Sequence, residues 1–425
     1  MDIYERSQLS ILLERLDEVP KRLIFITGPR QTGKTTLVKQ ALEQIDRPHR
    51  YLSADEVTPA TFPKFPLPGP DPTLVSDKPA NPVPEKKDIH WLVRHWEQAR
   101  VEAVNSESGF VLVFDEIQKI ANWSETVKGL WDADRWRDIH LHIVLLGSAP
   151  LLMQRGMTES LAGRYETIHL THWSFSEMSA AFGFDVNSYI YFGGYPGAAQ
   201  LISSQERWRE YVTGALIEPN IERDILALER VDKPALLKKL FEYGTDYSGQ
   251  IVSYTKMQGQ LQDAGNTTTL ARYLDLLANA GLIVGLIKYA GSIHHRRSSS
   301  PKLNVLNTAL MSAQSGYAFE EAQSDRSFWG RMVESAIGAH LLNTARPEYR
   351  IFYWKENAFE VDFVLERRPK LIAVEVKSGA RRRSIGGIKK FEGRFNVTNS
   401  ILVGADGIPV ADFLRASARD LLQDL

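Results

Sequence analysis

The chain has 425 residues, too many for one hydrophobic core, so its length predicts several domains. Hydrophobic residues make up 43% and charged residues 24%; with no membrane-length apolar run and no apolar signal core at the start, we expect a cytoplasmic protein without a membrane partner. The net charge of −1 favours no particular partner, and the absence of cysteine excludes disulfides, thiolate zinc sites and cysteine nucleophiles.

The first motif is a glycine-rich turn between an apolar run at 23–26 and a helix-like segment. It has the G-x-x-x-x-G-K-[ST] pattern of a P-loop, formed by Gly28, Pro29, Arg30, Gln31, Thr32, Gly33, Lys34 and Thr35. Backbone N–H groups of such a loop and of the helix that begins near Thr36 bind phosphates. Lys34 is expected on the β and γ oxygens and Thr35 on Mg²⁺, so the motif predicts ATP and Mg²⁺ as cofactors.

Two other segments surround the P-loop in the sequence. Residues 1–20 carry apolar side chains at helical spacing, which predicts an amphipathic helix packed on the nucleotide-binding domain. Residues 58–84 contain nine prolines, so neither a helix nor a paired strand can run through them. We interpret this stretch as an exposed insertion, either a solvated loop or a PxxP-type ligand.

The next motif is an apolar strand pattern at 110–114 that ends in two acids. A helix predicted at 88–104 precedes it. A buried parallel strand ending in acids after a P-loop is typical of a Walker B motif. Asp115 is therefore expected to bind Mg²⁺, and Glu116 to orient and polarise the attacking water.

Two further strand patterns bring additional candidate residues. The strand at 143–146 precedes Ser148, whose hydroxyl would reach the γ-phosphate or the attacking water, or would cap the following helix. Arg164 comes just before the strand at 167–170, where AAA-type ATPases carry the arginine finger, and Arg223 is the second candidate. A surface salt bridge is the alternative for either arginine. A finger supplied by a neighbouring subunit predicts a homo-oligomer.

The alternation of five strand patterns with helices predicts an α/β fold with a doubly wound parallel sheet and phosphates at the strand C-termini. We expect an N-terminal helix, an AAA-type P-loop ATPase core, a helical lid, a winged helix and a final α/β domain. Their predicted ranges are 1–20, 21–172, 173–245, 246–310 and 311–425.

The winged-helix prediction depends on the order of elements in 246–310. Two helix patterns separated by a turn are followed by strands at 282–289 and 302–306, with a basic tip at 291–297 between them. The second helix offers only Arg272 as a cation and also carries Asp275, which is poor for reading a major groove. The basic tip suits phosphate contact, but winged helices serve equally as protein contacts.

The last domain contains a pattern that suits metal-dependent phosphodiester hydrolysis. Asp362 lies in one strand-like run, and Glu375 and Lys377 share one face of the next. If these strands pair, the two carboxylates can hold Mg²⁺, with Glu334 as an additional ligand, and Lys377 can position the attacking water. The alternative is an ion pair between Asp362 and Lys377 in a domain without activity.

Local charge around this pattern is strongly positive. Residues 367–394 contain ten Lys or Arg and two Glu, a net charge of +8, with three consecutive arginines at 381–383. Such a segment is typical of a surface that binds a polyanion, and a solvated basic loop is the alternative.

Taken together, the chain resembles a widespread prokaryotic group of AAA-type ATPases whose C-terminal half is a domain of unknown function. The motifs that carry the resemblance lie at 28–35, 114–119, 160–164, 193–196, 269–283, 361–363 and 375–377. The resemblance implies an AAA core, a winged helix and a restriction-endonuclease-like end with a PD-(D/E)xK pattern. The chain departs from the group at 307–310, where Asn-Thr-Ala-Leu replaces Asp-x-Gly-Leu, and in its longer proline-rich insertion.

The leading hypothesis is an ATP-hydrolysing protein that acts on nucleic acid, with DNA the first expectation, and carries a metal-dependent nuclease domain. The alternative is a nucleotide-switched regulatory protein whose C-terminal half binds a protein partner and cleaves nothing. Stimulation of ATP hydrolysis by DNA or RNA would discriminate between the two.

Overall fold

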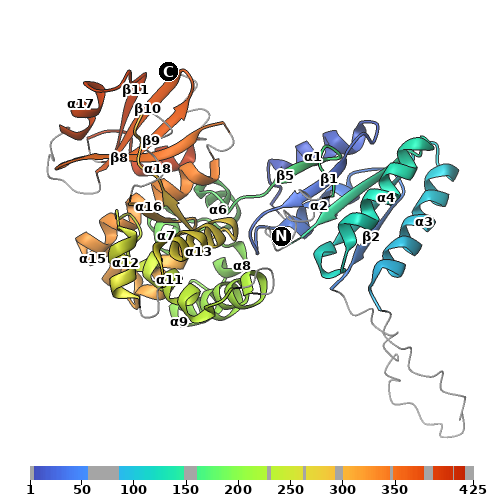
Figure 1. Ribbon diagram of the computed structural model, residues 1–425, viewed down its shortest axis with the longest axis horizontal. Helices are drawn as coiled ribbons and strands as arrows, with labels where there is room; N and C mark the ends of the chain where they lie inside the picture. Colours follow the sequence, from blue (N-terminus) through green and yellow to red (C-terminus); the bar gives the residue numbers. More distant parts are fainter. Residues whose placement is uncertain are drawn as a thin grey trace, which may run out of the picture.

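The chain folds into two lobes joined through the end of β5 (Figure 1). The first lobe contains the strands β1 to β5, and the second contains all later elements (Figure 1). This computed structural model describes residues 4–55, 86–147, 160–226, 231–261, 265–291, 300–344, 348–377, 386–404 and 406–416. Within them, no helix is long and apolar enough to cross a membrane.

A parallel sheet forms the centre of the first lobe. Its strands are β1 (Leu23–Thr27), β2 (His49–Ser53), β3 (Phe110–Asp115), β4 (Leu141–Leu146) and β5 (Tyr165–His169). They lie in the order β2-β3-β4-β1-β5, and every pair is parallel. All five strands therefore end at the same edge of the sheet, as predicted.

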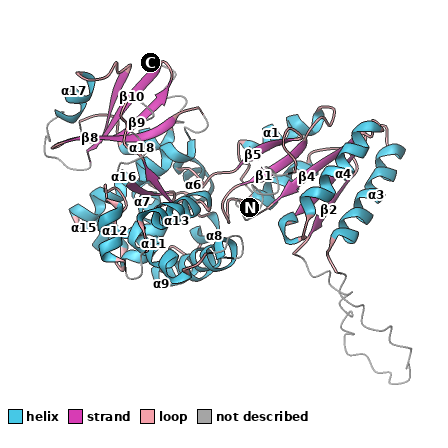
Figure 2. Ribbon diagram, in the orientation of Figure 1, coloured by secondary structure: helices cyan, strands magenta, loops and turns pink. Residues whose placement is uncertain are grey.

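Both faces of this sheet are covered by helices, because alternate residues of its strands point to opposite sides (Figure 2). α1 (Gln8–Asp17) and α2 (Lys34–Glu43) bury one set of aliphatic side chains. α3 (Ile89–Asn105) and α4 (Trp123–Trp136) bury the other set, which includes several tryptophans. The result is the three-layer α/β arrangement predicted from the alternating pattern.

Short helices dominate the first part of the second lobe. They are α6 (Phe175–Phe182), α7 (Val186–Phe192), α8 (Pro196–Ala199), α9 (Gln205–Glu210), the π-helices η2 (Tyr211–Ile217) and η3 (Asn220–Ile225), and α11 (Pro234–Asp246). α12 (Tyr254–Gln260) and α13 (Thr267–Asn279) follow. Next comes an antiparallel hairpin of β6 (Ile283–Leu286) and β7 (Lys302–Val305).

A second sheet closes the chain. α14 (Ala309–Ser315), α15 (Phe319–Ser324) and the long α16 (Arg326–Thr344) lead into it. Its strands are β8 (Arg350–Glu356), β9 (Phe359–Arg367), β10 (Lys370–Lys377) and β11 (Asn399–Gly404). The order is β11-β10-β9-β8, with only the β10–β11 pair parallel. α17 (Gly386–Glu392) lies between these two strands in the chain, and α18 (Val410–Arg415) follows; β11 was not predicted.

One hydrophobic core joins most elements of the second lobe, and a smaller cluster lies between the other face of the last sheet and α17. A continuous cluster of buried side chains extends from Trp173 to Leu414 and includes α7, α13, the hairpin, α16 and the second sheet. The backbone N–H of Tyr289, just after β6, also donates a hydrogen bond to the Tyr353 carbonyl of β8 at 2.7 Å. The boundaries predicted near residues 245 and 310 fall inside this shared core.

Candidate functional site: a P-loop and a carboxylate cluster

The loop after β1 has the backbone that its two glycines allow. Gly28 has φ +149°, and a Cβ atom there would lie 2.0 Å from the Leu170 carbonyl oxygen, so no other residue fits. Gly33 has φ +88° and caps the N-terminus of α2. The Thr32 hydroxyl donates to the Pro29 carbonyl at 3.0 Å and closes the loop. The N–H groups at the start of α2 thus lie beside the loop, which is an arrangement that binds phosphate.

Lys34 lies on the inner side of this loop. Its buried ammonium donates to the carbonyl oxygens of Gly28 at 2.9 Å and Pro29 at 2.7 Å. These two carbonyl oxygens hold the ammonium at the loop, where a phosphate would bind. Of the other predicted loop residues, Gln31 has φ +60° and is exposed, Arg30 is half-buried and Thr36 is exposed.

Asp115 and Thr35 form a pair of oxygen donors beside the loop. The Thr35 hydroxyl donates to Asp115 Oδ2 at 2.8 Å, and the Tyr51 hydroxyl donates to the same oxygen. The Glu116 N–H donates to Asp115 Oδ1 at 2.8 Å. A hydroxyl and a carboxylate in contact are hard oxygen ligands that suit Mg²⁺ shared with a nucleotide, so these residues fit the predicted cofactor.

Glu116 occupies a turn immediately after β3. Its φ of +54° places it in the left-handed region, which is unusual for a residue other than glycine. The Gln118 side chain donates to its carboxylate. Strained backbone at a strand end beside a phosphate site is common at functional positions, and it holds Glu116 next to Asp115. Ser148, the other residue predicted near the γ-phosphate, lies outside the residues that the structure describes.

Arg164 lies at the opposite edge of the sheet from the P-loop. Its carbonyl accepts from the Leu23 N–H at 2.9 Å, at the start of β1, whereas the P-loop follows the end of β1. Five residues of strand separate the two, about 17 Å. The guanidinium makes a bidentate ion pair with Asp132 of α4, at 2.8 and 2.9 Å, which lowers the pKa of that carboxyl. Arg164 therefore cannot act on the P-loop of its own chain; Arg223 lies on η3.

The P-loop also contacts residues that sequence analysis did not single out. The Thr32 carbonyl accepts from the Arg6 guanidinium at 3.0 Å and from the Trp173 indole N–H at 3.1 Å. Pro29 packs against Gly281 at the end of α13, where a Cβ would lie 2.4 Å from the Pro29 ring. These contacts join segments that are distant in the sequence. The only signals available in the sequence were an arginine, Arg6, just before an amphipathic helix and an isolated tryptophan, Trp173.

A buried histidine continues this contact into the second lobe. His172 Nε2–H donates to the Gly281 carbonyl at 2.8 Å, and burial lowers the pKa of His172 to about 4, so the ring is neutral. The Asn307 amide donates to the other ring nitrogen at 3.3 Å, and its oxygen accepts from the Gly194 and Ala309 N–H groups. An aspartate at 307 could not donate to the ring, which accounts physically for the departure noted at this position.

Sheet order, P-loop and acidic strand end together define a P-loop nucleoside-triphosphatase domain. Residues 20–179 match the family model described as AAA domain, so the N-terminal domain is an AAA-type P-loop ATPase domain. Residues 183–321 and 329–412 match two models described as domains of unknown function.

Known proteins similar to this chain share most of its length. An uncharacterised protein of Mycobacterium tuberculosis is 25% identical over 381 residues, which are 89% of this chain and 74% of that protein. An uncharacterised protein of Methanocaldococcus jannaschii is 23% identical and covers 60% of this chain and 58% of its own length. Among solved structures, a Walker-type ATPase of Pyrococcus abyssi has a TM-score of 0.48 at 15% identity, covering 74% of this chain and 96% of its own.

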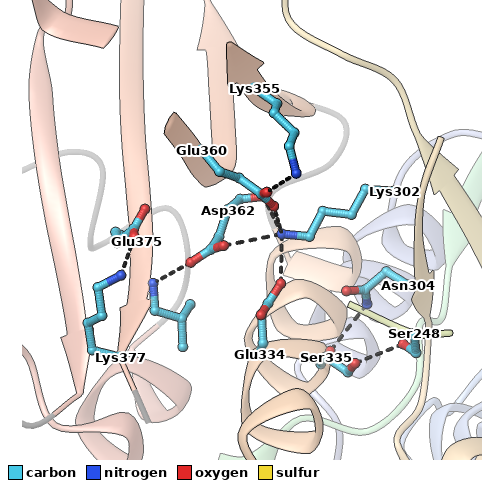
Figure 3. A network of polar contacts seen from close by, with 11 residues as sticks. Ser248, Lys302, Asn304, Glu334, Ser335, Lys355, Glu360, Asp362, Glu375 and Lys377 are labelled. Atoms are coloured by element: carbon cyan, nitrogen blue, oxygen red, sulfur yellow. Dashed lines mark hydrogen bonds and ion pairs between the residues drawn. The ribbon is translucent and has the colours of Figure 1, made fainter. Parts of the chain in front are cut away.

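A second polar site lies where the hairpin meets the last sheet (Figure 3). Its acids, which we call the carboxylate cluster, are Glu334, Glu360, Asp362 and Glu375. Glu334 comes from α16, Glu360 and Asp362 from β9, and Glu375 from β10. The Val376 N–H donates to Asp362 Oδ2 at 2.8 Å, so β9 and β10 pair as predicted and bring Asp362 next to Glu375.

A residue that sequence analysis did not consider lies among these acids. Lys302, the first residue of β7, is fully buried, and its Nζ is 2.6 Å from Glu334 Oε1, 3.3 Å from Asp362 Oδ1 and 3.5 Å from Glu360 Oε1 (Figure 3). Burial alone would lower its pKa, but these carboxylates raise it above its usual value. A charged residue at the head of an otherwise buried strand was the signal available in the sequence.

The acids of the cluster are held in a poorly hydrated environment. Burial raises the pKa of Glu334 despite the nearby Lys302, and burial together with Asp362 raises the pKa of Glu375. Glu375 also pairs with Lys377, so that the lysine predicted to position a water is bound to a predicted ligand. The described residues contain no group of three or more acids and histidines arranged to hold a metal. Lys302 takes the space between Glu334 and Asp362, which therefore does not fit Mg²⁺ as folded, while the buried Oε2 of Glu375 has no hydrogen-bond partner in the described part of the chain.

The basic surfaces are only partly in view. Arg272 and Asp275 of α13 are both exposed, and Lys389 and Lys390 of α17 are exposed beside the second sheet. Residues 292–297 of the predicted basic tip and the arginines at 381–383 lie outside the described residues.

Proposed function

We propose that this protein is an ATP-hydrolysing switch in which the P-loop transmits nucleotide state to the second lobe. Lys34 would bind the β and γ oxygens, and Thr35 and Asp115 would hold Mg²⁺, which neutralises phosphate charge during transfer. Glu116 would orient and deprotonate the attacking water. Arg164 would act on the site of a neighbouring subunit, because its own P-loop lies at the other edge of the sheet.

The observation that carries the proposal is the direct contact between residues of the second lobe and the P-loop. The Thr32 carbonyl accepts from Trp173, and Pro29 packs against Gly281. Phosphate binding repositions a P-loop by small amounts, and tightly packed contacts transmit such shifts because they cannot deform continuously. Nucleotide in the first lobe would thus bias the position of the second.

We propose nucleic acid as the target of the second lobe. Support comes from the order α12, α13 and a β-hairpin, which suits a winged helix, and from the +8 charge of residues 367–394. A protein partner is the second candidate, favoured by Asp275 on the exposed face of α13. A nuclease activity is not part of the proposal, because Lys302 lies among the acids that would bind the metal.

The test is ATP hydrolysis by the full chain, titrated with DNA and with RNA. We expect stimulation in the wild type, and in Glu116→Gln we expect ATP binding with turnover at least ~100-fold slower. Glu43→Gln, an exposed acid on α2, is the matched control and should behave as the wild type. Turnover in Glu116→Gln equal to the wild type would refute its role, and absence of stimulation by either polymer would favour a protein partner.

Coupling has its own variant. Trp173→Phe keeps an aromatic side chain but removes the indole N–H that donates to the Thr32 carbonyl, so stimulation should fall while basal turnover changes little. Trp136→Phe is the matched control, because Trp136 is 91% exposed on α4. Equal stimulation in Trp173→Phe and wild type would contradict coupling through this contact.

A further inference from the structure

Lys302 lies between Glu334 and Asp362, two of the residues predicted to bind a metal ion. Its ammonium contacts carboxylates from two separate elements, Glu334 of α16 and Asp362 of β9. Lys302 is 0% exposed, so water does not compete for these contacts. Mg²⁺ held by Glu334 and Asp362 would need the same two oxygens at about 2.1 Å. An ammonium and a divalent ion cannot both occupy the space between them.

We propose that Lys302 is the permanent cation of this cluster, and that the last domain is a metal-free binding domain without phosphodiesterase activity. This inference goes beyond the proposed function and is independent of the P-loop. A metal-dependent nuclease binds its cation from solution, whereas the cation of this cluster is the side chain of Lys302. Without a Lewis acid and a metal-bound water, the acids have no means to activate a nucleophile or to bind a scissile phosphate.

The backbone of Lys302 is held firmly in place. β7 pairs with β6 on one side, and on the other its residue Leu303 exchanges backbone hydrogen bonds with Gly249, at 2.8 Å, and Gln250, at 3.0 Å. On the same face of β7, the Asn304 amide donates to the Ser335 carbonyl of α16 at 3.2 Å (Figure 3). Gly338 allows this contact, since a Cβ there would lie 2.3 Å from the Asn304 oxygen. Lys302 therefore cannot leave the cluster by a shift of its strand.

The remaining charges of the cluster are also paired within the chain. Lys355 lies 3.0 Å from Glu360 Oε2, and Lys377 contacts Glu375. Every acid of the cluster thus contacts a lysine, and the ammonium groups come from β7, β8 and β10. Removing one partner of a buried ion pair leaves the other charge uncompensated, so without Lys302 the carboxylates of Glu334 and Asp362 should bind another cation.

The experiment measures Mn²⁺ binding to the nucleotide-free full chain by electron paramagnetic resonance of the free ion. Wild type and Asp362→Asn should bind Mn²⁺ identically, since Asp362 is already satisfied. Lys302→Met, which keeps the length of the side chain and removes its charge, should gain one Mn²⁺ site per chain. That site should disappear in Lys302→Met/Asp362→Asn, and Lys302→Arg should not gain it.

Several outcomes would overturn the inference. Wild-type binding of Mn²⁺ that is lost in Asp362→Asn would show a metal site in the native chain, and this comparison stands even if Lys302→Met does not fold. A folded Lys302→Met that binds no Mn²⁺ would show that Lys302 does not stand in for a metal. Cleavage of labelled DNA or RNA by the wild type that stops in EDTA and in Asp362→Ala would contradict it directly.

Discussion

The P-loop site and the carboxylate cluster both combine a buried lysine with acids, but they use the lysine in opposite ways. At the P-loop, carbonyl oxygens hold Lys34, while hydroxyl groups hold Asp115. Cation and acid each contact neutral oxygen groups there. In the cluster, Lys302 contacts the acids themselves. The same types of residue thus form a receptive site in one lobe and a neutralised one in the other, depending on which groups contact each charge.

The largest expected effect tests whether the P-loop site is receptive. Lys34→Ala should abolish measurable ATP binding, because it removes the cation that neutralises the β and γ oxygens. Binding of a fluorescent ATP analogue is the measurement. Lys39→Ala is the matched control, since Lys39 is exposed on the same helix. If Lys34→Ala bound ATP as well as Lys39→Ala does, the contrast between Lys34 and Lys302 would be wrong.

The next effect concerns how the receptive site is completed. Arg164→Ala should lower turnover by about 10³-fold if the arginine acts on a neighbouring subunit, whereas Arg135→Ala, an exposed residue of α4, should not. Arg164→Ala and Glu116→Gln should each be inactive alone. Mixed together they should regain activity, because an intact Arg164 of one chain can meet an intact Glu116 of another. A mixture as inactive as its components would rule out a finger supplied in trans.

The smallest effect distinguishes the two regions by pH. His172 is neutral in the folded chain with a pKa of about 4, below its unfolded value of 6.5, so the folded state binds fewer protons and loses stability as pH falls from 6.5 toward 4. The contribution is about 3 kcal/mol. Burial raises the pKa of Glu334, so its contribution has the opposite sign and stability falls as pH rises above 4.5.

Urea unfolding followed between pH 4 and 7 measures this. His172→Gln should lower the stability at pH 7, because the Gly281 contact is altered, yet its stability should fall less steeply in acid. Glu334→Gln should lose stability more steeply in acid than the wild type, because it lacks the opposing contribution of Glu334. An acid slope unchanged in His172→Gln would mean that other groups carry it.

Sequence patterns predicted the first lobe better than the second for a physical reason. The P-loop, Asp115 and Glu116 are set by strand ends and by glycines close in the chain, so local pattern determines where they meet. Asp362 and Glu375 were also predicted, because adjacent strands pair by a short connection. Lys302 reaches Asp362 from 60 residues away by tertiary packing alone. No periodicity encodes such a contact, and the contacts of Trp173 and His172 were not predicted for the same reason.

The shared core of the second lobe has a mechanical consequence. The hairpin and one face of the last sheet share one cluster of buried side chains, and tightly packed groups move together. Under the proposed function the lobe would therefore move as one body, with Thr171 and His172, which follow β5, at the joint. A small rotation there produces a displacement that grows with distance from the joint. The parts farthest from the P-loop would therefore travel the longest path in each nucleotide cycle.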